Sequence, residues 1–301
     1  MYLSVDCARL INDEIVLYEF YDRKVDDIAK EYYKDKTKEL KKLVDEVYLI
    51  HYESDFKSPK NIYVLQLTEG NPITILKNVD FNDFKNWYLQ QNIGTGPSKN
   101  FGEIKDGGDA YVEKILSDIS NYDLTQDNNG RNLITPALKG QPTHFFDFDL
   151  FHSENRFNVE FLKNESHVKK QQQYQDWELN NFQTHPNRYW NKNKKKFTTL
   201  WKACKLLNGE LYLVSYSDDK DELLHLMKVI SLDENGITSD IGYKLTYDNF
   251  IQWLTEMSKS TQDAQRLLEN LKVPHMIRDE EFWAQPTKTW KKQLITSWRP
   301  L

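Results

Sequence analysis

Hydrophobic residues along this chain follow two kinds of spacing, which predict where strands and helices lie. Glu14–Tyr21 (EIVLYEFY) is a short apolar run typical of a strand. Between Val25 and Val47, apolar residues recur at helical intervals within a strongly charged stretch, which predicts a helix. A second helix is predicted at Asp80–Gln91, because Asp is a good N-cap residue. Short strands are expected between these helices at Tyr48–His51, Ile62–Leu67 and Ile73–Leu76.

The second half of the chain also alternates between strands and helices. Two strands are predicted at His144–Phe151 and Arg156–Leu162, and their four-residue connection has the length of a hairpin turn. A helix at Asn191–Leu207 is expected to stop at Asn208-Gly209, a common C-terminal signal. No internal repeat is evident in this pattern. The remaining predicted elements are helices at Asp109–Tyr122, Tyr247–Lys259 and Thr261–Leu271 and strands at Glu210–Tyr216 and Leu223–Leu232.

A glycine-rich stretch at 92–108 is the best candidate for a linker in this pattern. We therefore expect a small α/β N-terminal domain at 1–100 and a larger core domain at 105–245. A helical C-terminal extension at 246–301 is expected to pack on that core. Alternating strands and helices indicate the α/β class.

Composition narrows the class of protein further. The 301 residues include 15 Phe, 17 Tyr and 8 Trp, an aromatic content that excludes a disordered chain. No apolar run approaches the roughly 18–20 residues that a membrane span needs, and Met1–Asp13 is acidic where a signal peptide is basic. Cys7 and Cys204 lie far apart, so neither a disulfide framework nor a zinc site is expected. A reducing cytoplasm is the expected location.

The segment with the most candidate chemistry is Phe145–Lys163 (FFDFDLFHSENRFNVEFLK). Strand alternation puts Asp147 and Asp149 on one face and the neighbouring apolar residues on the other. Glu160 lies within an apolar run of the second strand, where an ionised carboxylate is costly to bury unpaired. Across a hairpin, Asp149 and Glu160 offer the hard oxygen ligands that Mg²⁺ prefers.

The order of these elements resembles the core of the PD-(D/E)XK nuclease superfamily, which has the restriction-endonuclease-like fold. In that family, an Asp on one strand and a Glu/Asp-x-Lys on the next bind a divalent metal, and a Glu on the preceding helix often joins them. Carried over by residue, Asp149 matches the Asp, Glu160 the acidic residue and Glu113 the helix carboxylate. The resemblance covers about a third of the chain, from Asp109 to Tyr216. It implies a central mixed sheet flanked by helices, and Mg²⁺ (or Mn²⁺) held by Asp149, Glu160 and Glu113. Asp147, on the same face as Asp149, is a further candidate ligand.

The lysine departs from the family's spacing. This sequence reads Glu160-Phe161-Leu162-Lys163, one residue longer than Glu-x-Lys, so a regular strand sends Lys163 to the face opposite Glu160. Three explanations stay open. The strand bulges and Lys163 is catalytic; or a later lysine fills the role; or catalysis has been lost. The later lysines are Lys169, Lys170 and Lys196.

Simpler interpretations exist for the same residues. Asp147 and Asp149 can be solvent-facing positions of an amphipathic edge strand, with Glu160 in a cross-strand ion pair. Glu113 can be an ordinary solvated helix residue. The functional interpretation is favoured by the conjunction of an acidic strand, a second acidic strand and a basic helix, in that order.

The net charge of −6 argues against a uniformly basic nucleic-acid-binding protein, but the charge is unevenly spread. From Glu160 to Lys205 there are ten basic and four acidic residues, directly after the candidate carboxylates. A phosphate backbone would have to lie there, although a run of lysines can equally be a solvated helix face. The candidate nucleic-acid contacts are His185, Arg188, Lys192, Lys194, Lys195 and Lys196.

Together with these observations, the resemblance implies a Mg²⁺-dependent nuclease acting on nucleic acid, most simply DNA, and by analogy a role in bacterial or phage defence or DNA processing. Asp149, Glu160 and Lys163 are the expected catalytic residues. Nucleases of this fold often pair, which makes a homodimer a further option. The alternative is a catalytically inactive nucleic-acid-binding or assembly protein that keeps the fold. A third option is a protein-interaction module that uses the Trp-rich C-terminal end.

Overall fold

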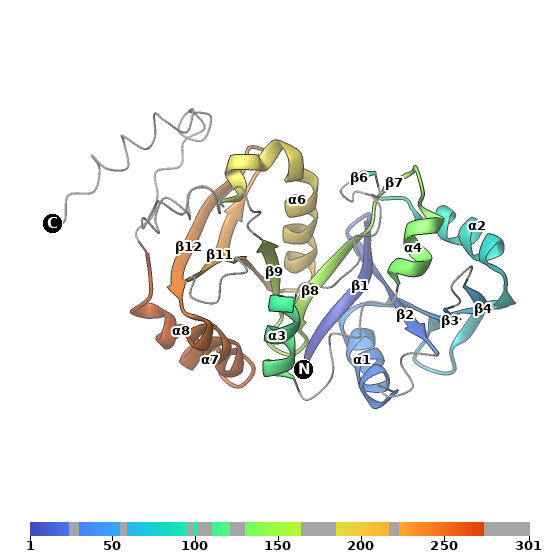
Figure 1. Ribbon diagram of the computed structural model, residues 1–301, viewed down its shortest axis with the longest axis horizontal. Helices are drawn as coiled ribbons and strands as arrows, with labels where there is room; N and C mark the ends of the chain where they lie inside the picture. The colour runs from blue at the N-terminus through green and yellow to red at the C-terminus, as the bar shows by residue number, and fades with distance from the viewer. Residues whose placement is uncertain are drawn as a thin grey trace.

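The computed structural model describes residues 1–23, 30–54, 59–94, 99–100, 110–120, 130–163, 185–216 and 223–273. Within them, ten strands form one mixed sheet in the order β12-β11-β10-β9-β8-β1-β2-β3-β4-β5 (Figure 1). The first five are β1 (Tyr2–Ile11), β2 (Glu14–Asp22), β3 (Glu46–Glu53), β4 (Lys60–Leu67) and β5 (Ile73–Val79). The other five are β8 (Phe146–His152), β9 (Phe157–Lys163), β10 (Glu210–Tyr216), β11 (Leu224–Leu232) and β12 (Ile237–Leu245).

Helices cover both faces of this sheet. One face carries α1 (Lys30–Leu43) and α6 (Trp190–Leu206), which share a hydrophobic cluster with β1, β2 and β10. The other face carries α2 (Phe81–Gln91) and α4 (Arg131–Ala137) at one end and α3 (Ala110–Ile119), α7 (Tyr247–Met257) and α8 (Thr261–Glu269) at the other. A short helix η4 (Pro186–Tyr189) precedes α6, and β6 (Lys99–Asn100) pairs with β7 (Pro142–Thr143) in a separate ribbon. The predicted α/β class, with a large mixed sheet flanked by helices, is confirmed.

The two faces follow directly from alternation along the strands. In β2, Leu17 packs with the α1–α6 face while Tyr18 packs toward α2. In β10, Leu213 packs with the α1–α6 face while Tyr212 packs toward α7. Because both faces of these strands are buried, their sequences read as continuous apolar runs.

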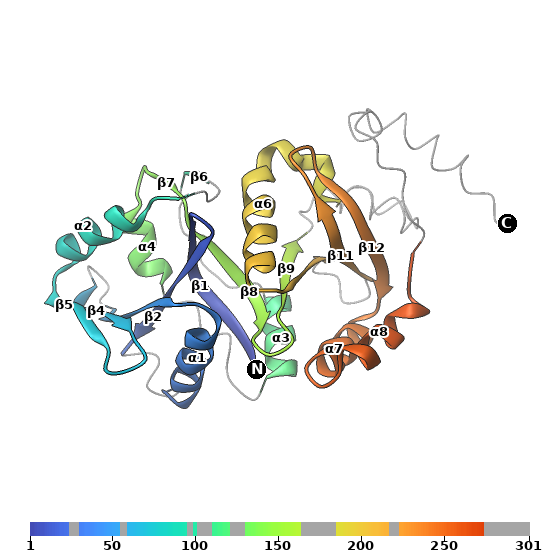
Figure 2. The ribbon, with the colours of Figure 1, turned by 180° about the vertical axis from the view of Figure 1, so that it is seen from behind.

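The sheet is built from two halves with the same connectivity. Each half begins with two antiparallel strands, and a helix then connects the second strand to a third that lies parallel to it. Two further strands follow, each antiparallel to the one before it, and a helix ends the half. The first half is β1-β2-α1-β3-β4-β5-α2, and the second is β8-β9-α6-β10-β11-β12-α7. They meet at the antiparallel pair of β1 and β8. In Figure 1, a half-turn about this pair in the plane of the picture exchanges α6 with α1 and α7 with α2, and Figure 2 shows the same relation from behind.

Sequence similarity between the halves supports this duplication, so the expectation of no repeat was wrong. Glu46–Tyr52 (EVYLIHY) and Glu210–Tyr216 (ELYLVSY) occupy equivalent strands and are identical at four of seven positions. In both strands a Tyr hydroxyl donates a hydrogen bond to the Glu at its start, Tyr48 to Glu46 and Tyr212 to Glu210. The repeat is short and interrupted by segments of different length, which hides it from a search for fixed periods.

Most predicted elements lie where the spacing put them, and the main differences are one helix end and several elements that were not predicted. The helix predicted for Val25–Val47 ends at Leu43, and Glu46 already belongs to β3; residues 24–29 lie outside the described part. The strands β1 and β12 and the helix α4 were not predicted. Strand β1 lies at the centre of the sheet, so this omission concealed how the halves join.

The two expected domains contribute strands to one continuous sheet. Residues 1–100 contribute β1 to β5, and 105–245 contribute β8 to β12 of the same sheet. Of the expected linker 92–108, residues 95–98 and 101–109 lie outside the described part. In the C-terminal extension, α7 and α8 pack on the sheet through Trp253 and Leu268, and 274–301 with its tryptophans is not described. No helix among the described residues has the length and apolar character to cross a membrane.

A candidate carboxylate–lysine site at a strand fork

The candidate site lies where β8 and β9 separate. Their hydrogen-bonded pairing begins at the hairpin and ends at Leu150 and Val159. One residue further, Asp149 uses its side chain, and its Oδ2 accepts the backbone N–H of Phe161 at 2.8 Å. The carboxylate therefore takes the place of a backbone acceptor, which fixes it at the opening of the fork.

Glu160 is the next residue on β9 and lies inside the protein. Its side chain is 1% exposed, and one carboxylate oxygen forms an ion pair with the Lys196 ammonium of α6. Apart from this ion pair, neither oxygen has a hydrogen-bond partner among the described residues. Buried carboxylate oxygens normally have such partners, so this group is short of them in the protein alone.

The electrostatics of the cluster are dominated by its negative charge. Burial raises the pKa of the Glu160 carboxyl well above its ordinary value, and the nearby Asp149 and Asp147 raise it further, while Lys196 opposes them. For Lys196, burial by itself lowers the pKa, but Glu160, Asp147 and Asp149 together hold it above the usual lysine value. Counting the described residues, three carboxylates thus act on one ammonium, which gives a formal charge of −2 when all are ionised.

The position of Lys196 depends on how the start of α6 is anchored. The Trp190 indole Nε1 donates to the carbonyl of Glu234 at 3.0 Å, in the turn between β11 and β12. Lys196 is followed by Phe197, which is buried in the core beneath α6. The helical turn that carries Lys196 is therefore held over β9. From there the Lys196 side chain, which is 26% exposed, reaches Glu160.

The lysine expected on β9 itself lies elsewhere. Lys163 is exposed at the strand's end, and the pairing of β9 with β10 runs from Phe157 to Lys163 without a register shift. A regular strand puts Lys163 on the face opposite Glu160, and no bulge brings it back. Of the later lysines proposed, Lys196 is the one that meets Glu160; Lys169 and Lys170 lie outside the described residues.

The other two predicted metal ligands are less directly involved. Asp147 is half-buried on β8 and acts on Glu160 through its charge. Glu113 is half-buried in the first turn of α3, on the sheet face opposite α6, and its predicted role stays a prediction. Among the described residues, no three His, Cys, Asp or Glu side chains stand close enough together to hold an ion.

The predicted nucleic-acid contacts divide into buried, exposed and undescribed side chains. His185 is buried, caps η4 by accepting the N–H of Asn187 and lies 3.3 Å from Asp240, so its contacts explain it structurally. Lys194 and Lys195 line the outer side of α6, half-buried and exposed. The side chains of Arg188 and Lys192, and all of 164–184, are outside the described part.

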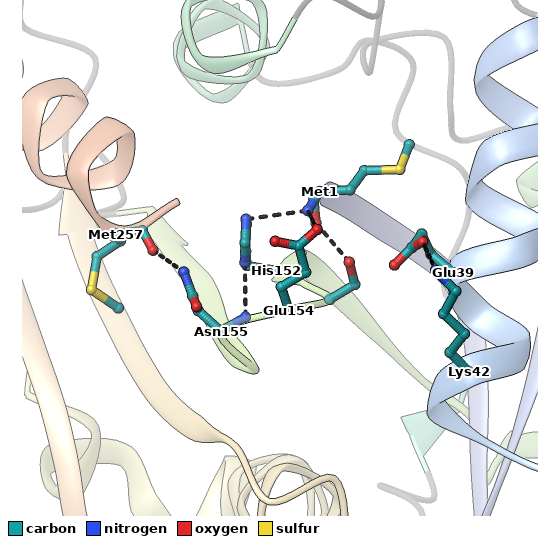
Figure 3. Close-up of polar contacts among 8 residues, drawn as sticks. Met1, Glu39, Lys42, His152, Glu154, Asn155 and Met257 are labelled. Carbon is teal, nitrogen blue, oxygen red and sulfur yellow. Dashed lines mark hydrogen bonds and ion pairs between the residues drawn. The ribbon is translucent and has the colours of Figure 1, made fainter. Parts of the chain in front are cut away.

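The hairpin that carries both acidic strands is fastened at its turn. As Figure 3 shows, the Met1 amino group faces the His152 ring, at 3.2 Å from Nε2, and the Glu154 carboxylate, at 3.9 Å. On the other side, Asn155 donates from its side chain to the carbonyl of Met257 in α7. These contacts hold the closed end of the fork between β1 and α7.

A pocket lies in the first half of the chain, at the ends of β2 and β3 beside α1. It has a volume of about 430 Å³ and includes Arg23, Lys34 and His51 with Tyr21 and Tyr33 in its lining. Burial, with Arg23 nearby, lowers the pKa of His51 to about 4. The described residues that line this pocket include no carboxylate, in contrast to those of the fork.

Sequence reasoning found the carboxylates but could only offer Lys196 as one of several lysines. The usable signal was its place in the first turns of the helix that follows β9, together with the wrong spacing of Lys163.

No family model, curated protein or solved structure matches this chain.

Proposed function

We propose that this protein is a metal-dependent nuclease that hydrolyses phosphodiester bonds, with its site at the β8–β9 fork. The observation that carries the proposal is the cluster's charge. In the part of the chain that the structure describes, three carboxylates act on one ammonium, and Glu160, buried within them, has no hydrogen-bond partner beyond that ammonium. A buried excess of negative charge is costly unless a cation balances it.

A divalent ion fits the groups present. Asp149 and Glu160 supply carboxylate oxygens, and Mg²⁺ typically takes one or two carboxylates while keeping waters and substrate phosphate. The absence of a third close ligand among the described residues is compatible with that preference. When bound, such an ion activates water and neutralises charge on the phosphate.

The role of Lys196 follows from its protonation. Its pKa is held above the usual value, so it keeps its proton at neutral pH and cannot act as a general base. It is suited to stabilise negative charge that develops on a phosphate oxygen. With Lys163 exposed on the opposite face, Lys196 is the better candidate for the family's lysine.

The order of elements supports the same proposal. Strand β8 carries Asp149, β9 carries Glu160, the basic α6 follows, and β10 lies parallel to β9. This is the order expected from the resemblance to the PD-(D/E)XK superfamily. Nucleic acid, most simply DNA, is the proposed substrate, and Lys194 and Lys195 support it by extending the positive charge of α6 beyond Lys196.

One observation favours the alternative of an inactive nucleic-acid-binding or assembly protein. Lys196 already forms an ion pair with Glu160, which partly satisfies both groups without any ligand. Under this alternative the ion pair is structural, and removing either partner harms folding rather than cleavage.

Cleavage of plasmid DNA with Mg²⁺ or Mn²⁺ separates the two. We expect wild-type activity that is lost in Asp149→Asn, Glu160→Gln and Lys196→Met, each checked for native folding by circular dichroism. Lys202→Met is the matched control, since Lys202 lies on the same helix but pairs with Asp13. Metal-independent cleavage, or equal cleavage by all variants, would reject the nuclease proposal. Nucleic-acid binding without cleavage would favour the alternative.

A further inference from the structure

The first half of the chain contains the same fork with the same residue types. The pairing of β1 with β2 ends at Cys7 and Tyr18, as that of β8 with β9 ends at Leu150 and Val159. One residue beyond, Asp6 Oδ2 accepts the backbone N–H of Phe20 at 2.9 Å. Asp6 therefore repeats the contact that Asp149 makes with Phe161.

The glutamate and the lysine recur as well. Glu19 follows Tyr18 on β2 and forms an ion pair with Lys36 of α1 at 2.5 Å, as Glu160 does with Lys196 of α6. The register of the neighbouring parallel strand also agrees, because Glu19 lies opposite Leu49 and Glu160 opposite Leu213. Agreement in strand, helix and register makes coincidence an inadequate explanation.

The two sets differ in how far the protein satisfies them. In the first half, Glu19 and Lys36 are each 1% exposed, and Glu19 Oε1 also accepts the N–H of Asp6 at 3.4 Å. In the second half, Lys196 is 26% exposed, and no described residue gives Glu160 such a hydrogen bond. In the first set the ion pair is sealed from solvent on both sides, whereas in the second the lysine is partly exposed.

The charges differ in the same direction. Asp147 precedes Asp149 by two residues, and the equivalent position before Asp6 is Ser4. Counted by equivalent positions, the first set has two carboxylates, Asp6 and Glu19, and the second has three, Asp147, Asp149 and Glu160. One carboxylate fewer reduces the need for a further cation.

We infer that the first half is a second copy of the nuclease-like unit whose Asp6–Glu19–Lys36 set is closed and structural. One chain then combines an open copy and a closed copy where a homodimer would have two open ones. The inference rests on the proposed function in one respect: with a single open site, the enzyme cuts one strand of duplex DNA per encounter. Each cut adds one water across one P–O ester bond, giving a phosphate monoester and a hydroxyl.

Supercoiled plasmid distinguishes one working site from two. With Mg²⁺ or Mn²⁺, we expect nicked circles to accumulate almost completely before linear DNA appears. The double variant Glu19→Gln/Lys36→Met replaces the closed pair by neutral groups of similar size and should nick at the wild-type rate within about twofold, while Glu160→Gln should not nick. Direct conversion to linear DNA by wild type, together with nicking alone by the double variant, would show two working sites and overturn the inference.

A readout that needs no cleavage keeps the two proposals apart. Calorimetric titration with Mn²⁺ should give one bound ion per chain, lost in Glu160→Gln and kept in the double variant. If no cleavage occurs but this single dependence on Glu160 holds, the nuclease proposal fails and the inference stands. Thermal melting covers the case in which no metal binds: Lys36→Met should then lower the midpoint by several degrees more than Lys196→Met. An equal or reversed shift would overturn the inference.

Discussion

The two forks show how one framework yields a structural ion pair in one place and a candidate ligand site in another. Both place an Asp at the point where strand pairing stops, a Glu one step along the next strand and a Lys on the following helix. In the first half the lysine is sealed and the glutamate accepts a backbone N–H. In the second the lysine is accessible and a third carboxylate, Asp147, is added.

The comparison teaches that residue types alone do not define a site. A buried Glu–Lys pair in which both side chains are sealed from solvent can be a purely structural ion pair. The same pair with a further carboxylate and a partly exposed lysine carries an excess of negative charge, which a bound cation can balance. Access and charge balance, rather than the presence of Asp, Glu and Lys, separate the two halves.

The largest expected effect is on stability in the first half. Lys36→Met leaves Glu19 buried without its ammonium, and breaking a buried ion pair in this way typically costs about 3–5 kcal/mol. Lys196→Met should cost less, about 1–2 kcal/mol, because Lys196 is partly exposed and the raised pKa of Glu160 lets it take up a proton. Urea denaturation of both variants measures the difference. Equal losses would contradict the assignment of one closed and one open copy.

The next largest effect is on activity in the second half. Glu160→Gln removes a proposed ligand and should lower the cleavage rate by roughly 10²–10³-fold, a typical range for losing one stabilising group. The same variant should no longer gain thermal stability from Mg²⁺, since binding to the folded state is what raises the melting temperature. Glu19→Gln/Lys36→Met is the matched control and should keep both properties.

Exchanging the residue that differs between the forks sharpens the comparison further. Ser4→Asp adds a third carboxylate to the closed set and should destabilise the protein by about 1–2 kcal/mol through repulsion of like charges. Because that set is closed, Mg²⁺ should not restore the loss, and melting with and without Mg²⁺ tests this. Restoration by Mg²⁺ would show that charge alone, without access, distinguishes the halves.

The smallest predicted effect concerns pH and involves one histidine in each half. Burial lowers the pKa of His152 to about 4, helped by the Met1 ammonium, and burial with Arg23 does the same for His51. The unfolded chain therefore binds more protons between about pH 6.5 and 4, so acidification through this window lowers stability. We expect a contribution of about 1–2 kcal/mol from His152.

His152→Gln should flatten the dependence of the unfolding free energy on pH across this window, measured by urea denaturation at several pH values. His51→Gln serves as the comparison in the other half. An unchanged slope in His152→Gln would contradict the assigned pKa of that ring.

Much of the local structure could be predicted from spacing. The helix at Asp80–Gln91 begins as expected, with the Asp80 side chain accepting the N–H groups of Asn82 and Asp83. Strand β1 was missed because Asp6 and Arg9 interrupt an otherwise apolar stretch. The burial of Arg9 is made possible by a partner far along the chain, Gln91, which local spacing does not reveal.

The candidate site was predictable in part for the same reason. Alternation put Asp149 beside Glu160 in adjacent strands, and the structure has both at the fork. The choice of lysine was not predictable, because it depends on where α6 is held by Trp190 against the β11–β12 turn. The closed copy was missed because Asp6 lies on β1, which was not predicted. Without β1, nothing in the sequence brings Asp6 to Glu19 and Lys36.

The sequence by itself determined the α/β class, most strands and helices, and two carboxylates within reach of each other, because these depend on spacing of 2 and 3.6 residues. Tertiary structure decided that β1 pairs with β8, that Lys196 rather than Lys163 meets Glu160, and that the first half is a closed copy of the second. The physical reason is that any exposed strand edge offers the same backbone donors and acceptors. Which strands pair, and which side chains then meet, is fixed only when the whole core packs.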